Sequence, residues 1–304
     1  MLSIIIGEHN EDPLFLKKMI NQVSLLPYKK ELIFATSSKF SDFYSTFGRM
    51  DNYKFPVSVI GGADSCGAGR NAGGFMASGD TLLYMDAHCC FTPSAVDRLL
   101  KTLNEHPDSI VAPALQPVEF PSCVPAGGLA HGVAFEFSKD GGVFQWRWLP
   151  ADRTDKEFPV PFVCGCAFSM KKSTFDVLNG IGGFLVGHQG LSWEEEVSMR
   201  LARMGNLSYS EPRAIFGHMF KGYENRPKWD THSVSGYYKT RVAGFYVNVF
   251  DKDLWNQIEP MLIKAWGDEY YKNLEWAKTN FGWLRAQMKP YANRIDERYF
   301  LRVK

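Results

Sequence analysis

A run of apolar and aromatic residues, Leu82-Leu83-Tyr84-Met85, most strongly constrains how this chain folds. Four such residues in a row are typical of a strand covered on both faces, as in a parallel α/β sheet. The run leads into Asp86-Ala87-His88, and parallel sheets bind ligands at the carboxyl ends of their strands. On an extended segment Asp86 and His88 leave the same face, so a carboxylate and an imidazole can meet one divalent cation. Taken alone, the same pattern also fits a loop salt bridge or a helix cap.

Apolar runs and helix-like segments alternate through the first part of the chain. Strands are expected at residues 2–6, 31–35, 56–60 and 81–85, and helices at 13–25, 39–48 and 67–78. This alternation predicts an α/β fold with a parallel, Rossmann-like sheet, right-handed crossovers and helices on both faces. A further strand is expected at 110–115. Pro113 places it towards a sheet edge or at its end, because proline cannot donate to a ladder.

The second half contains fewer regular patterns. Residues 131–148 fit a hairpin around Asp140-Gly141-Gly142, a favourable turn sequence, and an amphipathic helix is expected at about 193–204. A polar loop is expected at 221–228. Two or three amphipathic helices should follow, with these large apolar residues: Leu254, Trp255, Ile258, Leu262, Trp266, Tyr270, Trp276, Trp283 and Leu284. We expect the helices to cap the rest of the chain. The alternatives are a dimer interface, an acceptor-docking surface, or nucleic-acid binding by scattered basic and aromatic residues.

Composition sets further bounds. A chain of 304 residues with 45% hydrophobic content can bury a sizeable core, and a net charge of +1 neither favours nor excludes an acidic partner. Apolar runs are too short for a membrane span, and the chain begins with a strand rather than a charged leader. The six cysteines form no CxxC pair, which disfavours a zinc site. Their mostly apolar or small neighbours suit reduced thiols, so we expect a cytoplasmic enzyme of bacterial or viral origin.

Small residues and one arginine precede the strand that ends at Asp86. Residues 67–80 read Gly-Ala-Gly-Arg-Asn-Ala-Gly-Gly-Phe-Met-Ala-Ser-Gly-Asp. The small side chains allow close approach to a ligand or to the sheet, and Arg70 offers a planar fork suited to phosphate. Together with the following strand, this run resembles the family-2 glycosyltransferase pattern of a G-x-x-x-A-R-N-x-G helix, A-x-G-D, an apolar strand and an acidic metal motif. The Asp-Ala-His-Cys form at 86–89 resembles the polypeptide N-acetylgalactosaminyltransferases more narrowly.

Further segments resemble the same family, in the same order along the chain. They are His9-Asn10-Glu11 after the first strand, Phe-Gln-Trp-Arg-Trp-Leu-Pro at 144–150, the strand at 162–170 containing Cys164-Gly165-Cys166, the acidic helix at 193–200, and Gly217-His218-Met219-Phe220-Lys221. The similarity covers about residues 1–225. It implies a GT-A catalytic domain of residues 1–225, with a nucleotide-binding half (1–115) and an acceptor and sugar half (116–225). A helical extension, 226–304, follows; we expect no anchor, stem or lectin module.

The resemblance implies an enzyme that moves a hexose or N-acetylhexosamine from a nucleotide diphosphate sugar, best matched by a UDP-sugar, to a hydroxyl. The acceptor could be a protein, a glycan or a hydroxymethylated DNA base. Asp86, His88 and His218 would hold Mn²⁺ or Mg²⁺, which neutralises charge on the leaving diphosphate. The residues expected to contact the nucleotide sugar are Gly7, His9, Asn10, Glu11, Asp64, Arg70, Ala87, Gly165, Cys166 and Lys221. Asp64 is included because no Asp-Asp-x-Ser turn, which binds uracil in the family, follows the second strand.

The acidic helix leaves the stereochemistry open. Glu194 lies six residues before Arg200, where inverting relatives keep a catalytic carboxylate, whereas the retaining relatives have a glutamate at the position of Trp193. We expect Glu194 or Glu195 to face the acceptor, and we favour retention of configuration. Glu196 and Arg200 are four apart, so an intrahelical ion pair also explains them.

Two readings from other classes remain. The first is a non-catalytic sugar-nucleotide binder. The second is a nucleotidyltransferase, which the absence of a lysine from Gly7-Glu8-His9-Asn10-Glu11 disfavours.

Overall fold

A mixed central sheet forms the core of the molecule. The computed structural model describes residues 1–8, 11–36, 53–61, 66–137, 144–149, 155–181, 193–220 and 234–303. The sheet has the order β10-β12-β6-β11-β4-β1-β2-β3, with β5 paired to β12 and β7 to β6. Its strands are β1 (Leu2–Glu8), β2 (Lys30–Thr36), β3 (Val57–Ile60), β4 (Thr81–Asp86), β5 (Cys89–Cys90), β6 (Ile110–Glu119), β7 (Val124–Pro125), β10 (Phe158–Val160), β11 (Ala167–Lys171) and β12 (Ser208–His218).

The N-terminal half has the expected parallel arrangement. Strand β1 pairs in parallel with both β2 and β4, and β2 pairs in parallel with β3. Strand β11, from the second half of the chain, enters antiparallel between β4 and β6. The sheet is therefore mixed where the sequence predicted only parallel pairing, although the α/β fold class is confirmed.

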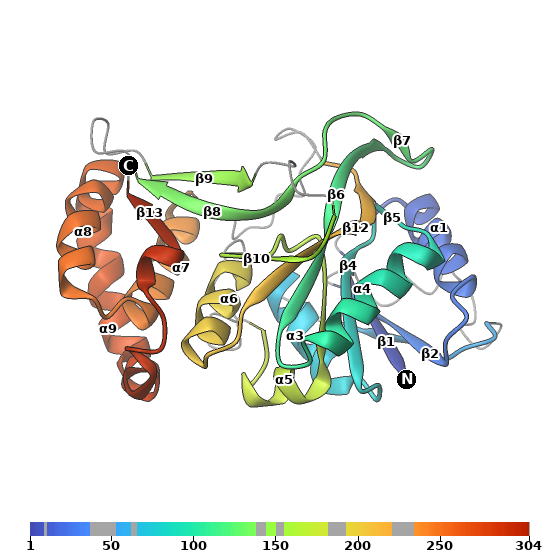
Figure 1. Ribbon diagram of the computed structural model, residues 1–304, viewed down its shortest axis with the longest axis horizontal. Coiled ribbons are helices and arrows are strands. Elements are labelled where there is room, and N and C mark those ends of the chain that lie inside the picture. The colour runs from blue at the N-terminus through green and yellow to red at the C-terminus, as the bar shows by residue number, and fades with distance from the viewer. Residues whose placement is uncertain are drawn as a thin grey trace.

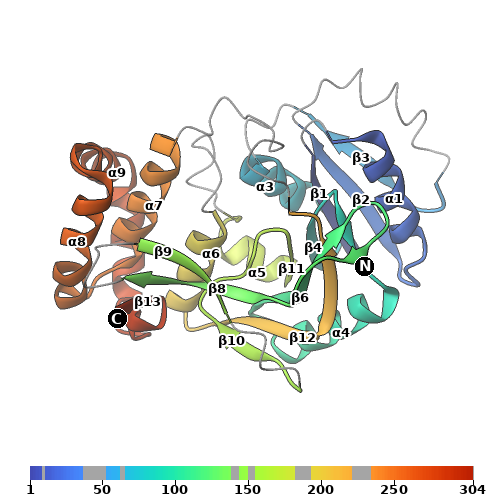
Figure 2. The same ribbon diagram turned by 90° about the horizontal axis from the view of Figure 1, so that it is seen from above.

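Helices cover both faces of this sheet (Figures 1 and 2). Helices α1 (Pro13–Ser24) and α4 (Pro93–Glu105) pack on one face, against a core that includes Ile4 and Ile6. The other face, which includes Ile5 and Tyr84, receives α5 (Lys172–Val177) and α6 (Trp193–Arg203). On that side α3 (Cys66–Met76) also approaches closely, since a Cβ at Gly73 would lie 2.6 Å from a methyl carbon of Ile5. At that position the small residue serves packing against the sheet. The helix expected at 39–48 lies outside the described residues.

The expected position of Pro113, towards a sheet edge or at the end of its strand, is wrong. Strand β6 lies inside the sheet, between β12 and β11. Proline is tolerated there because β11 pairs with β6 only at Ile110 and Val111, so no strand needs a hydrogen from Pro113 on that side. On its other side Pro113 is opposite Glu211, where a bulge in β12 begins.

A second, three-stranded sheet joins the central sheet to the C-terminal helices. It pairs β8 (His131–Phe137) with β9 (Phe144–Leu149), antiparallel, and with β13 (Leu301–Val303), parallel. The two strands of the expected hairpin are thus present, whereas its turn, Asp140-Gly141-Gly142, lies outside the described residues.

In the described part of the chain after β12, three helices follow the central sheet and pack against α6. They are α7 (Val234–Asn248), α8 (Lys252–Trp266) and α9 (Asp268–Met288), followed by the short helical turns η3 (Lys289–Tyr291) and η4 (Glu297–Tyr299). Figure 1 shows them as one layer beside α6, far from β1 and β2. Their buried side chains share a core with Met199 and Ala202 of α6 and with Phe162. These contacts agree with the expected cap. Of the large apolar residues that were expected in these helices, Trp283 is exposed.

Two of the cysteines differ from the expectation of reduced thiols. Cys90 and Cys123 form a disulfide, and Cys89, Cys164 and Cys166 are buried free thiols. Cys123 lies in the turn between β6 and β7, so the disulfide bond connects this turn to β5. The residues that flank the two cysteines do not reveal that they lie close together in the fold. Among the described helices, none combines the length and apolar character that a membrane crossing requires.

Candidate active site

Three side chains from two distant segments converge at the carboxyl end of β4. Asp86 is the last residue of β4, and the chain turns at Ala87 and His88 before entering β5. Strand β5 then pairs antiparallel with the end of β12, which places His218 opposite Cys89. This pairing brings His218 to Asp86 although the two residues are far apart in sequence. Ligand atoms of Asp86, His88 and His218 all lie within 4.8 Å of one another.

The three groups point at one another in a way that suits a cation. Asp86 Oδ2 lies 3.1 Å from His218 Nε2 and 3.8 Å from His88 Nε2. The Asp86 side chain is 24% exposed, whereas the His88 and His218 side chains are 10% and 9% exposed. The cluster is therefore closed on the imidazole side and open beside the carboxylate, where a ligand can enter.

Charges around Asp86 keep it ionised. Burial alone would raise the pKa of Asp86, but Arg70 and the two histidines hold that pKa well below its usual range. Burial lowers the pKa of His218, an effect that Asp86 opposes, so this imidazole is neutral at neutral pH. An anionic oxygen with a neutral imidazole is the protonation state that metal ligation needs.

Two residues predicted to contact the nucleotide sugar, Arg70 and Glu11, contact Asp86 and His88 of this cluster. Arg70 is buried; its Nη2 pairs with Asp86 Oδ1 and its Nη1 donates to the Gly165 carbonyl at 2.6 Å. Glu11 Oε1 lies 3.2 Å from His88 Nδ1, the nitrogen that faces away from Asp86 Oδ2. The sequence did not predict these two contacts, because it does not reveal which side chains meet after folding.

Four further residues predicted to contact the nucleotide sugar lie around the same strand ends: Gly7, Ala87, Gly165 and Cys166. Gly7 is flanked by Ala35 on β2 and by Asp86 on β4. The Asp86 amide donates to the Cys166 carbonyl at 2.9 Å, which sets the Gly165–Cys166 turn beside Asp86. Ala87 is fully buried. The predicted residues His9, Asn10, Asp64 and Lys221 lie outside the described part of the chain.

The acidic helix α6 carries three consecutive glutamates with different surroundings. Glu196 pairs with Arg200, which also donates to the Gly180 carbonyl at 3.0 Å, so the intrahelical pair is present and anchors the loop after α5. Glu195 Oε1 lies 3.5 Å from Arg241 Nη2 of α7. Helix α6 begins at Trp193, whose side chain is outside the described set.

Burial and mutual repulsion perturb these carboxyls. Burial raises the pKa of Glu194 well above its usual range, and the Glu195 charge raises it further. The pKa of Glu195 is also raised by burial, which the Arg241 charge opposes. For Glu196 burial raises the pKa to about 7, against the pull of Arg200. Glu194 is thus the carboxyl of the three with no cation paired to it among the described residues, and its Oε2 is buried without a hydrogen bond there.

Aromatic side chains that sequence reasoning did not single out frame the cluster. The Phe220 ring packs edge-on against His218, with ring centroids 4.4 Å apart, and Trp148 of β9 packs edge-on against Phe220 at 5.7 Å. Both residues occur in segments that resemble the family, so their motif context was the available signal. Arg241 lies outside the segments that resemble the family, so no motif pointed to it.

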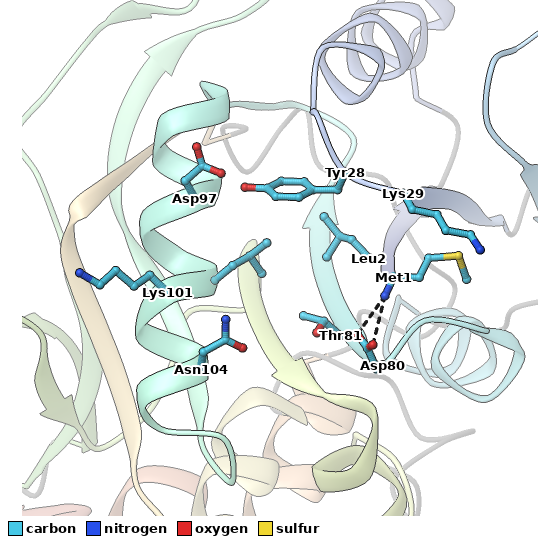
Figure 3. Close-up of a pocket in the computed structure, with 10 residues that line it drawn as sticks. Met1, Leu2, Tyr28, Lys29, Asp80, Thr81, Asp97, Lys101 and Asn104 are labelled. Atoms are coloured by element: carbon cyan, nitrogen blue, oxygen red, sulfur yellow. Dashed lines mark hydrogen bonds and ion pairs between the residues drawn. The ribbon is translucent and has the colours of Figure 1, made fainter.

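A separate cavity lies at the opposite end of the sheet. The hollow has a volume of about 460 Å³. Figure 3 shows the residues that line it, from the starts of β1 and β4 and from α4. The Met1 amino group donates to Asp80 within it. Leu2 and Thr81 begin the strands that end near Asp86, so this cavity is remote from the clustered ligands.

The sequence is similar to those of known glycosyltransferases. The family model described as glycosyl transferase family 2 matches residues 3–178. A polypeptide N-acetylgalactosaminyltransferase 3 of Taeniopygia guttata is 28% identical over 240 residues, which is 72% of this chain and 38% of that protein. A probable N-acetylgalactosaminyltransferase 8 of Caenorhabditis elegans is 26% identical over 58% of this chain and 42% of its own length. The chain thus spans about two fifths of these relatives.

Solved structures share the fold. That of GalNAc-T7 with UDP, GalNAc and Mn²⁺ superposes with a TM-score of 0.68 at 16% identity, covering 93% of this chain and 56% of that one. Residues 1–349 of S. aureus TarS superpose with a TM-score of 0.55 at 11% identity, covering 98% and 90%. At these identities the likeness shows the fold, which is the GT-A fold.

Proposed function

Because the chain belongs to glycosyl transferase family 2, we propose that it transfers a hexose or N-acetylhexosamine from a nucleotide diphosphate sugar to a hydroxyl acceptor. The single observation that carries this proposal is the convergence of Asp86, His88 and His218 at the open end of β4. Two imidazoles and one carboxylate form a mixed ligand set that accommodates Mn²⁺. The similarly folded GalNAc-T7 structure contains UDP, GalNAc and Mn²⁺, which supports a UDP-sugar as donor.

The three residues fit a divalent cation in geometry and charge. Both Nε2 atoms face Asp86 Oδ2, and the exposed side of the carboxylate leaves room for phosphate oxygens. A bound Mn²⁺ would neutralise the charge that develops on the leaving diphosphate. Arg70 holds the carboxylate through Oδ1 and so leaves Oδ2 for the cation. Glu11 contacts His88 Nδ1, and we propose that it orients this ring and fixes Nε2 as the ligand atom.

The sugar pocket is proposed to lie between the Gly165–Cys166 turn and the acidic helix. Arg70 bonds to both that turn and Asp86, so one side chain joins the proposed pocket wall to the proposed metal ligand. Gly7 and Ala87 border Asp86, and we keep them as residues of the nucleotide side. Roles for His9, Asn10, Asp64 and Lys221 rest on the family resemblance.

Glu194 is proposed to orient the acceptor rather than to act as its base. A carboxyl with a raised pKa holds its proton more readily, and a protonated Glu194 can donate a hydrogen bond to an acceptor oxygen. In a retaining reaction the leaving phosphate can take the acceptor proton, so no protein base is needed. We therefore propose retention of configuration. Glu196 and Arg200 serve structure by holding α6 against the loop after α5.

We propose a division of the chain at about residue 225. Residues 1–225 would form the catalytic domain, with a nucleotide-binding half up to residue 115, and residues 226–304 its helical extension. The shared core of α6 and α7 supports an extension that is docked rather than tethered.

Donor turnover tests the proposal. We expect purified protein with Mn²⁺ to hydrolyse one member of a nucleotide-sugar panel slowly, and to do so faster with a hydroxyl acceptor present. Mass spectrometry of the released nucleoside diphosphate gives the rate and the donor. Binding without release, with every donor and metal, would favour the non-catalytic binder, whereas release of pyrophosphate from a nucleoside triphosphate would favour a nucleotidyltransferase.

A further inference from the structure

The C-terminal extension holds the acidic helix through buried contacts. Met199 and Ala202 of α6 share one apolar core with Val242 and Phe245 of α7. Figure 2 shows α7 beside α6, on the side of α6 away from strands β1 to β3. The face of α6 that bears Met199 and Ala202 is therefore packed against the extension.

Arg203, at the end of α6, fixes the same two parts to each other. Its side chain is fully buried, donates from Nε to the Asn248 carbonyl at 2.9 Å, and pairs with Glu297. The Glu297 carboxylate in turn accepts from the Phe250 amide at 2.8 Å. A buried charge with this many partners is costly to displace, so the extension cannot slide along α6 freely.

A second buried ion pair crosses the same boundary near the start of α6. Arg241 of α7 and Glu195 of α6 are 7% and 2% exposed, and Arg241 Nη2 lies 3.5 Å from Glu195 Oε1. Among the described residues, the charged or titratable groups that act electrostatically on the Glu194 and Glu195 carboxyls, besides the two carboxyls themselves, are Arg70, Cys164 and Arg241. Of these, Arg241 is the cation that pairs with Glu195.

Two adjacent carboxyls that are largely shielded from water repel each other when both are ionised. The Arg241 guanidinium lies beside Glu195 and favours the charged form of that carboxyl, against the effect of burial. The ion pair also ties the first turn of α6, which carries Glu194, to α7.

We propose that Arg241 is a positioning residue that the C-terminal extension supplies to the reaction, acting on Glu194 through its ion pair with Glu195. This inference rests on the proposed glycosyltransferase function. It makes the extension part of the catalytic apparatus, although Arg241 itself does not touch the substrate.

Kinetics of matched variants on α7 test the inference. Arg241→Gln should raise the KM for the acceptor by roughly tenfold, the loss typical of a strong hydrogen bond, because Glu194 is no longer held where it orients the acceptor, and kcat should change by less than about threefold. Mn²⁺ and UDP binding, titrated directly, should be unchanged. Arg241→Lys, which keeps the positive charge, should bring the acceptor KM most of the way back to the wild-type value. The control is Lys239→Gln, because Lys239 lies on the same helix but faces the Trp276 ring of α9, 4.1 Å away; its acceptor KM should equal that of the wild type.

A double-mutant cycle separates a direct effect from one that runs through Glu195. If the inference holds, Arg241→Gln combined with Glu195→Gln has the same acceptor KM as Glu195→Gln alone. Additive increases in KM, an unchanged acceptor KM in Arg241→Gln, or an equal increase in Lys239→Gln would overturn it. Should the glutamine variant fail to fold, Arg241→Met, which also removes the positive charge, takes its place in the cycle with the same criterion.

Carboxyl ¹³C NMR of glutamate-labelled protein decides the inference without turnover. Removing the Arg241 charge should raise the pH at which Glu195 titrates, whereas Lys239→Gln should leave it in place. Absence of turnover in wild-type protein would reject the proposed function, and the NMR titration would still establish or reject the coupling of Arg241 to Glu195.

Discussion

Asp86→Ala is expected to lower donor turnover at least about 10³-fold, equivalent to about 4 kcal/mol of transition-state stabilisation. The variant loses the oxygen on which both imidazoles converge, and with it the anchor of a cation worth several kcal/mol to a leaving diphosphate. The measurement is the release of nucleoside diphosphate at saturating Mn²⁺. Asp97→Ala is the control, since Asp97 is an exposed aspartate on α4 that lines the cavity at the other end of the sheet.

The Asp86→Ala substitution also affects Arg70. It is buried and pairs with Asp86, so alanine also leaves a guanidinium with a lost partner. Asp86→Asn keeps an oxygen that can accept from Arg70 and should fold with a melting temperature near that of the wild type. Turnover in a folded Asp86→Asn variant equal to that of the wild type, or full wild-type turnover in chelator, would contradict a catalytic metal at this site.

Glu194→Gln is expected to weaken acceptor binding about tenfold, the loss typical of a strong hydrogen bond, while kcat changes by less than about threefold. This follows if the leaving phosphate accepts the acceptor proton and Glu194 only orients the acceptor. The measurements are KM for the acceptor, kcat, and the anomeric coupling constant of the product by NMR. We expect an α-linked product from an α-linked donor.

An inverting reaction predicts a different result for the same variant. If Glu194 is the base of an inverting reaction, Glu194→Gln keeps the shape of the side chain but costs at least about 10²-fold in kcat. A β-linked product together with such a loss would overturn retention.

Local patterns predicted the N-terminal half well, and non-local pairing accounts for what they missed. Strands β1 to β4 follow from apolar runs whose burial is set by their own sequence. The internal position of Pro113 depends on β11, a strand more than fifty residues further along, which pairs with β6 only up to Val111. The Cys90–Cys123 bond likewise depends on how the β6–β7 turn packs.

Sequence patterns were also limited in predicting which side chains of the site contact one another. Asp86 and His88 were identified from their spacing at a strand end, although the chain turns there rather than staying extended. His218 was identified by family resemblance, and the β5–β12 pairing supplies its physical reason. The partners of Glu11 and Arg241 were missed because a charge pattern does not reveal which buried groups meet across two elements.

Titration of Mn²⁺ into the wild-type protein, followed by the EPR signal of the free ion, tests the central claim most directly. We expect a single Mn²⁺ to bind at Asp86, His88 and His218, more tightly when UDP is present. Glu11→Gln should weaken this binding by roughly 10- to 100-fold, as expected for the loss of a group that orients a ligating histidine. Absence of saturable binding in the presence of UDP, or binding that His88→Ala and His218→Ala leave unchanged, would contradict a metal centre at the end of β4.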